Sequence, residues 1–227
     1  MFGSRTELAI AYARALATDG VTRGLIGPRE APRLWERHLL NCAVVTEAIG
    51  EGLDVCDIGS GAGLPGLVMA IRRPDLRVTL VEPLLRRTTF LSEVVQRLGL
   101  ANVEVVRERA ESLHGGVDFA VVTSRAVAPL PRLLEWSMPL VRRGGELVAM
   151  KGASAEDEVA TSTTDLARWG GGAVDVLTLG TGLVNPPTTV IRVEAARPSA
   201  LGYGAGSATP GRRAKPGRHP RGRGRRT

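Results

Sequence analysis

Short apolar runs alternate with amphipathic segments along most of this chain of 227 residues. Apolar runs of about four to eight residues are typical of buried strands, and apolar positions spaced by three or four are typical of helices that cover a sheet. We predict strands over residues 53–58, 77–82, 103–106, 117–122, 146–150, 174–179 and 188–193. Helices are predicted between them over residues 84–98, 130–141 and 154–169. This order predicts an α/β fold, in which helices cover both faces of a mainly parallel, seven-stranded sheet.

Two further amphipathic helices are predicted ahead of the first strand, over residues 4–18 and 32–49. In the second, Leu34, His38 and Cys42 lie on one apolar stripe at helical spacing. We therefore expect His38 to be a buried, hydrogen-bonded histidine rather than a catalytic one. These helices predict an N-terminal helical extension before the sheet.

Charge is distributed unevenly. The formal net charge is +7, but residues 195–227 hold eight Arg, one Lys and no acidic residue, so residues 1–194 carry −2. The tail is rich in Gly, Pro, Ser and Arg with little to bury, and we predict that it is disordered. It is either a basic arm that attracts RNA phosphates or a dispensable extension. The predicted organisation is an extension (1–50), a main domain (51–194) and this tail.

A glycine-rich stretch follows the first predicted strand. Four glycines occur within eight residues, at Gly59, Gly61, Gly63 and Gly66. Glycine is needed where a backbone turns sharply and approaches a ligand closely. Pro65 is predicted at the first helical position, where its missing N–H costs nothing. The stretch therefore predicts a strand, a tight loop and a helix.

The residue before this loop helps to choose among ligands. The spacing Gly61-x-Gly63-x-x-Gly66 matches the dinucleotide fingerprint, which is weak evidence alone. Asp57, however, ends the strand where dinucleotide-binding folds place an apolar residue. The pattern acid-x-Gly-x-Gly-x-Gly resembles motif I of S-adenosylmethionine-dependent methyltransferases, whose cofactor presents an ammonium to an acid and a carboxylate to a helix start. A glycine-rich turn without a ligand is the alternative.

A second acid supports a nucleoside-like ligand. Glu82 lies 25 residues after Asp57, at the end of the second predicted strand. An acid at this place can accept hydrogen bonds from both ribose hydroxyls. The alternative is an ordinary solvated carboxylate at a strand end.

Five stretches occur together in a specific order: residues 34–41, 57–66, 82–87, 122–126 and 150–152. In combination they resemble the ribosomal RNA small subunit methyltransferase G family, also called glucose-inhibited division protein B, over about residues 5–194. The resemblance implies a Rossmann-like class I methyltransferase of the bacterial cytoplasm. It also implies methyl transfer from S-adenosylmethionine to N7 of one guanine in 16S ribosomal RNA.

The resemblance also implies site residues. It places Gly59, Leu64, Ala110, Glu111 and Arg125 at the cofactor, with Arg125 also at the target as the catalytic residue. Together with the acids and loop glycines, the predicted cofactor-binding set is Asp57, Gly59, Gly61, Leu64, Glu82, Ala110, Glu111 and Arg125. The basic residues predicted to contact RNA phosphates are Arg37, Arg86, Arg87 and Lys151, each of which could instead be a solvated charge.

The residue types fit this chemistry. Guanine N7 carries an unprotonated lone pair at neutral pH, so its methylation needs no general base and the lack of a nucleophilic triad or a metal-ligand cluster is expected. Positive charge moves from sulfur to the purine, so a cation at N7 would hinder the reaction. Arg125 is therefore expected at the guanine O6 or a phosphate, unless it is a structural Arg paired with a strand-end carboxylate. Asn185, before Pro186 and Pro187, is predicted to lie in a turn.

Other features set limits on function. Cys42 and Cys56 are the only two cysteines and are expected to be reduced packing residues. No run of 18 apolar residues and no secretory signal is present, so we expect a cytoplasmic protein with no membrane span. We also expect a monomer without a metal ion. The expected partner is small-subunit rRNA or the assembled subunit. Two alternatives stay open: a methyltransferase for a small molecule or protein, and a non-catalytic RNA- or dinucleotide-binding protein.

Overall fold

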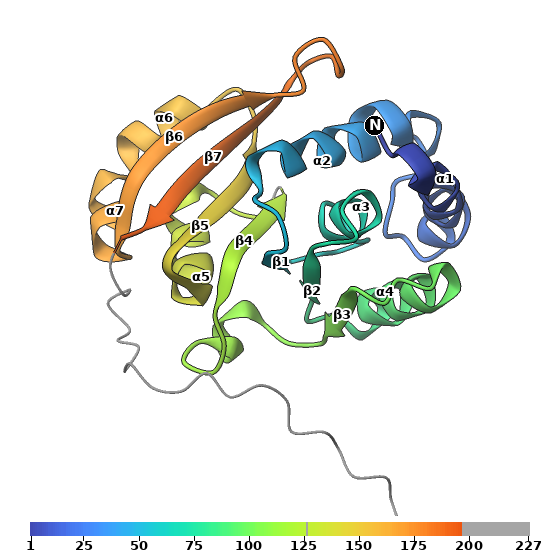
Figure 1. Cartoon of the computed structure of the whole chain (residues 1–227), viewed down its shortest axis with the longest axis horizontal. Helices are drawn as coiled ribbons and strands as arrows, with labels where there is room; N and C mark the ends of the chain where they lie inside the picture. The colour runs from blue at the N-terminus through green and yellow to red at the C-terminus, as the bar shows by residue number, and fades with distance from the viewer. Residues whose placement is uncertain (126, 197–227) are drawn as a thin grey trace, which may run out of the picture.

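The computed structural model describes residues 1–125 and 127–196. Seven strands form one sheet in the order β3-β2-β1-β4-β5-β7-β6, with helices on both faces (Figure 1). Strands β1 to β5 pair in parallel, and β7 runs antiparallel between β5 and β6. The predicted fold class is confirmed.

The strands follow the predicted apolar runs closely. Their bounds are β1 (Asp54–Ile58), β2 (Arg77–Val81), β3 (Val103–Val106), β4 (Phe119–Arg125), β5 (Val141–Lys151), β6 (Gly171–Leu179) and β7 (Thr188–Ala195). The largest difference is at β5, which begins at Val141 instead of residue 146. The predicted helix over residues 130–141 stops earlier because Pro139 lacks an N–H and restricts the residue before it.

The helices are shorter than predicted. Their bounds are α1 (Thr6–Ala15), α2 (Leu40–Val44), α3 (Gly66–Arg72), α4 (Leu85–Leu98), α5 (Leu130–Ser137), α6 (Ala155–Thr161) and α7 (Thr163–Arg168). Wider π turns extend the first two predicted helices, at Leu16–Gly20 after α1 and at Trp35–Leu39 before α2. The helix predicted over residues 154–169 divides at Ser162 into α6 and α7.

Two hydrophobic clusters lie on opposite faces of the sheet. Along β1, Val55 belongs to the cluster beneath α1 to α4, whereas Cys56 and Ile58 belong to the cluster beneath α5 to α7. This alternation is expected because successive side chains of a strand point to opposite faces. Both faces of the central strands are therefore buried, as a mainly parallel sheet requires.

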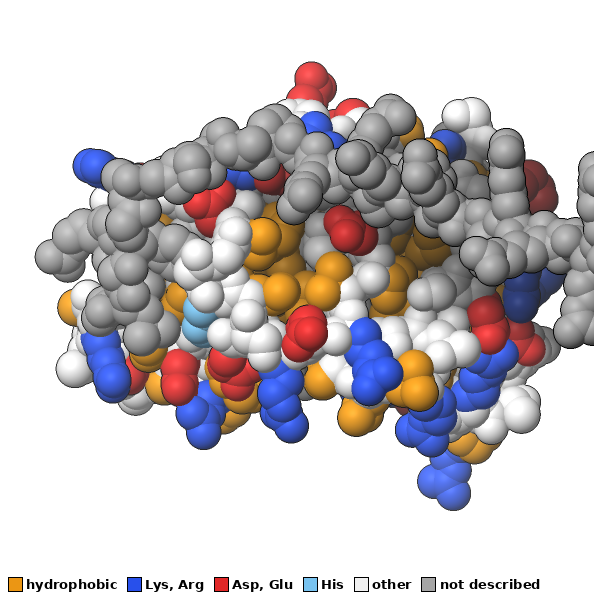
Figure 2. Space-filling model, turned by 90° about the horizontal axis from the view of Figure 1, so that it is seen from below, with side chains coloured by type: hydrophobic (Ala, Val, Ile, Leu, Met, Phe, Trp, Pro, Cys, Tyr) orange, Lys and Arg blue, Asp and Glu red, His pale blue; other side chains and the backbone are white. Residues whose placement is uncertain are grey.

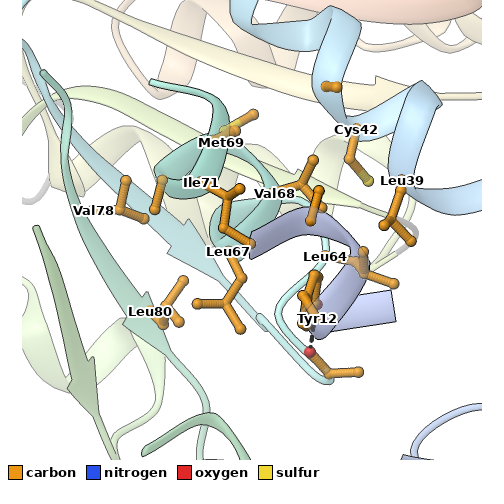
Figure 3. Close-up of a cluster of buried hydrophobic side chains, with 14 of the residues drawn as sticks. Tyr12, Leu39, Cys42, Leu64, Leu67, Val68, Met69, Ile71, Val78 and Leu80 are labelled. Atoms are coloured by element: carbon orange, nitrogen blue, oxygen red, sulfur yellow. Dashed lines mark hydrogen bonds between the residues drawn. The ribbon is translucent and has the colours of Figure 1, made fainter. Parts of the chain in front are cut away.

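The N-terminal segment packs into the first of these clusters. Tyr12 of α1 and Cys42 of α2 are fully buried with Leu67 and Val68 of α3 (Figure 3). The predicted extension thus shares one hydrophobic cluster with the sheet and with α3. The predicted basic tail lies, from residue 197, outside the described residues. Over the described part of the chain, no helix combines the length and apolar character needed to cross a membrane.

Candidate active site

The predicted strand, loop and helix are present at the carboxyl end of β1. Gly59 and Gly63 have φ values of +66° and +98°, which a residue with a side chain rarely adopts. The Gly59 N–H donates to Val81 O of β2 at 2.9 Å, so the loop begins against the neighbouring strand. Helix α3 begins at Gly66, and Pro65 lies one residue before it rather than at its first position.

Asp57 lies beneath this loop. Its side chain is fully buried, and its Oδ2 accepts a hydrogen bond from the Gly66 N–H at 3.0 Å. Its Oδ1 has no hydrogen-bond partner among the described residues. Burial raises the pKa of this carboxyl to about 7. Asp57 does not line the cavity described below, so we now expect it to act by holding the start of α3 rather than by touching a ligand.

Glu82 connects the loop to the segment after β2. Its Oε2 accepts hydrogen bonds from the Gly61 N–H at 3.1 Å and from Arg87 Nη1 at 3.2 Å. Its Oε1 accepts one from the Leu84 N–H at 3.0 Å. The side chain is 1% exposed but reaches the cavity wall. A buried carboxylate is thus fixed where two strand ends meet.

A cavity of about 650 Å³ lies over the carboxyl ends of β3, β2, β1 and β4. Its position beside β1 is the place where the strand order reverses, which is where open α/β sheets bind ligands. Seven residues of the predicted cofactor set line it: Gly59, Gly61, Leu64, Glu82, Ala110, Glu111 and Arg125. The structure therefore brings together every member of that set except Asp57.

Other lining residues carry no sequence signal that would have placed them here. Leu25 and Ile26 come from the connection after α1, and Trp136 comes from α5. Leu25 and Ile26 reach the cavity from a non-helical connection and Trp136 reaches it from a helix, so segments that are distant in the sequence complete its wall. The hydroxyl of Tyr12 also acts on this region from α1, since it donates to Ala62 O in the loop at 2.8 Å (Figure 3).

Arg125 is held by the N-terminal segment. Its Nη1 lies 2.7 Å from His38 Nδ1, and His38 Nε2 lies 2.9 Å from Glu30 Oε2. The other Glu30 oxygen accepts a hydrogen bond from Arg37 Nη1 at 3.0 Å. His38 is hydrogen-bonded and half-buried, which agrees with the structural role expected for it. Arg125 contacts a histidine instead of the carboxylate partner that its structural alternative required.

A second cavity, of about 830 Å³, adjoins the first. Arg125 and Val127 line both, so the two spaces share a wall. Pro186 and Pro187, from the turn predicted before β7, line the second cavity. A molecule that donates a group in one cavity would therefore face the molecule that receives it in the other cavity, with Arg125 between them.

The basic residues predicted to contact RNA differ in their surroundings. Arg86 is exposed, and the Arg37 side chain is 49% exposed although it pairs with Glu30. The Lys151 side chain is only 8% exposed, and its Nζ pairs with Glu158 at 2.7 Å. We therefore no longer expect Lys151 to contact a phosphate.

Charges of both signs occur on the surface shown in Figure 2. Lys and Arg side chains lie along one margin of that face, with Asp and Glu side chains near them and hydrophobic side chains between. Within residues 1–125 and 127–196, no group of three or more His, Cys, Asp or Glu side chains is placed to hold a metal ion.

Comparisons with known proteins place these cavities in context. The family model for rRNA small subunit methyltransferase G matches residues 5–182. The chain belongs to this family. A member from Nocardioides sp. is 59% identical over 199 residues, which cover 88% of this chain and 80% of the relative. A member from Salinispora tropica is 60% identical over 200 residues, which cover 85% of this chain and 83% of the relative.

Two solved structures of other methyltransferases resemble this chain in fold. A methyltransferase from Pyrococcus furiosus matches with a TM-score of 0.54 and 16% identity over 70% of this chain and 83% of that protein. A ribosomal protein L11 methylase from Lactobacillus delbrueckii matches with a TM-score of 0.52 and 13% identity over 68% and 76%. At these identities the likeness concerns the class I methyltransferase fold alone.

Proposed function

We propose that this protein transfers the methyl group of S-adenosylmethionine to N7 of one guanine in 16S ribosomal RNA. The observation that supports this best is the first cavity, where seven predicted cofactor residues converge beside a second cavity that shares Arg125. Membership of a family named for rRNA methylation supports the choice of substrate.

The first cavity has features that suit this cofactor. Glu82 offers a fixed carboxylate to paired ribose hydroxyls, because its backbone donors leave acceptor positions free. Gly59 permits close approach, since a Cβ there would already lie 3.1 Å from Val127. Ala110 and Glu111 line the cavity after β3, on the side opposite Arg125 in the strand order, where the adenine would lie.

The reaction requires positioning more than acid–base chemistry. S-adenosylmethionine supplies an electrophilic methyl group on a sulfonium, and the bond electrons return to sulfur as the guanine N7 lone pair forms the new C–N bond. The chain's task is to hold the two reactants in line, which can lower a barrier by about 7–11 kcal/mol. Arg125 lies between the cavities and can donate to the guanine O6 or to a phosphate. It would then orient the base without competing for N7.

We also propose a cytoplasmic monomer that binds small-subunit rRNA, free or assembled, with Arg37 and Arg86 as phosphate contacts. Arg87 would contribute only if it left Glu82, with which it pairs. If the basic tail is an RNA arm, truncation after Arg197 reduces the salt dependence of RNA binding.

The test is direct. 16S rRNA and small subunits from cells that lack this enzyme are incubated with the protein and S-adenosylmethionine, and nuclease digests are examined for 7-methylguanosine by mass spectrometry. We expect one modified guanine with wild type and none with Arg125→Ala. Methylation of a protein or metabolite without rRNA would favour the alternative acceptor, and thermal stabilisation by NAD but not by S-adenosylhomocysteine would reject the methyltransferase assignment.

A further inference from the structure

The hydrogen-bonding pattern around His38 determines which of its nitrogens carries the proton. An arginine guanidinium only donates hydrogen bonds, so Nδ1 must accept from Arg125 Nη1 at 2.7 Å. Nε2 therefore carries the hydrogen, and it donates to Glu30 Oε2 at 2.9 Å. The pattern requires a neutral imidazole in a single tautomer, which accepts a hydrogen bond from Arg125 and donates one to Glu30.

This chain of contacts ends at the wall between the two cavities. Glu30 and His38 come from the N-terminal segment, whereas Arg125 ends β4, 87 residues further along the chain than His38. The Arg125 side chain has several rotatable bonds before its planar guanidinium, and among the described residues His38 is the side chain that accepts a hydrogen bond from it. The direction of the Arg125 guanidinium is thus set by a residue of the N-terminal segment.

We propose that His38 is a positioning residue for methyl transfer, which keeps the Arg125 guanidinium aimed at the space shared by the two cavities. The proposal rests on the function given above and names a residue on which the orientation of the acceptor depends. It also makes the N-terminal segment part of the catalytic arrangement, although none of its residues needs to touch the reacting atoms.

Two substitutions separate this role from simple packing. In His38→Asn, the amide Oδ1 replaces the Nδ1 acceptor that faces Arg125, but the contact with Glu30 is lost. In His38→Gln, the amide Nε2 replaces the donor that faces Glu30, but the acceptor for Arg125 is lost. Asparagine is the smaller side chain, so a packing role predicts that His38→Asn is the more damaging change.

The positioning role predicts the opposite order. We expect kcat for His38→Gln to be about tenfold or more below that for His38→Asn, with similar KM for RNA in both, because a lost hydrogen bond to a charged group has an effect of this size. Equal kcat values, or a lower kcat for His38→Asn, would overturn the proposal. Thermal unfolding of both variants identifies any loss caused by reduced stability.

The pH profile gives a second readout. The charged groups facing His38 are Arg125 on β4, Glu30 in the preceding turn and Arg37 on its own turn. Burial, followed by Arg125, lowers the pKa of His38 from its ordinary value of 6.5. Protonation would turn Nδ1 into a donor facing a cation, so kcat of the wild type should fall on the acid side. His38→Asn should lack that component, and an identical acid limb in both would contradict the role.

A measurement without turnover separates the two proposals. In an NMR titration of the imidazole, the wild type should show the Nε2–H tautomer, and Arg125→Ala should raise the pKa of His38 because a nearby positive charge is removed. An unchanged pKa or the other tautomer would refute the contact even if the enzyme is inactive on guanine. A wild type that leaves rRNA unmodified while this shift is seen would instead refute the proposed function.

Discussion

Replacing Glu82 by alanine is expected to weaken the binding of S-adenosylhomocysteine about 10- to 150-fold. A carboxylate has about four acceptor positions, and the N–H groups of Gly61 and Leu84 occupy two of them. Arg87 occupies a third, but its side chain is 39% exposed and can turn into solvent. Two positions are then available for the vicinal ribose hydroxyls. Hydrogen bonds to a charged acceptor contribute about 1.5–3 kcal/mol, which gives the stated range.

Isothermal titration calorimetry with S-adenosylhomocysteine measures the effect. Glu104→Ala is the matched control, because Glu104 is an exposed acid on the adjacent strand β3 and should leave the affinity unchanged. Loss of Glu82 also leaves two backbone donors without their partner, so unfolding is followed in parallel. A folded Glu82→Ala protein whose affinity stays within about threefold of wild type would refute the ribose role, since even one lost hydrogen bond to a charge exceeds that change.

Three further predictions concern buried groups. The pKa of the Asp57 carboxyl is raised from 3.8 to about 7, so its stabilising contribution is fully present below pH 4 and is lost as the pH rises through 7. In urea titrations, the free energy of unfolding should therefore fall by about 3 kcal/mol between pH 5 and pH 8. The variant Asp57→Asn should lack this pH dependence. Gly66→Ala should lower stability by about 1–3 kcal/mol, because a Cβ would clash with the Leu80 side chain and would also lie 2.7 Å from Asp57 Oδ2. Gly116→Ala is the control and should change stability little, because the nearest atom to its Cβ would be 3.6 Å away. Burial raises the pKa of the Cys42 thiol to about 12. Cys42 should therefore resist alkylation at pH 8 in the native protein and react in the denatured protein. Rapid alkylation of Cys42 in the native protein would contradict its packing.

Local patterns in the sequence were sufficient for the sheet and for the position of the glycine-rich loop at the edge of the first cavity. The apolar runs located all seven strands, since both faces of the central strands are buried and the runs are therefore continuous. The acids at Asp57 and Glu82 and the glycines between them identified the strand ends that form the cavity. These signals succeed because each depends on residues that are close in the chain.

The features that the sequence did not reveal depend on contacts between distant segments. Nothing near Asp57 in the sequence indicates that it lies below the loop, because its position depends on the packing of α3 against the sheet. The early start of β5 at Val141 depends on its pairing with Phe119 of β4. The approach of His38 to Arg125 requires the N-terminal segment to lie beside the carboxyl end of β4, which no local spacing reveals.

The placement of β7 has a consequence for how the chain can be shortened. This strand is among the last described residues, but it lies inside the sheet and is the only described strand that pairs with β6. A nascent chain that ends before Thr188 would expose two further strand edges, one on β5 and one on β6, that β7 covers in the described sheet. Each of these edges could pair with another molecule. The described sheet is therefore complete only when β7 has been added, and a premature stop a few residues ahead of Thr188 should yield aggregates rather than a smaller working enzyme.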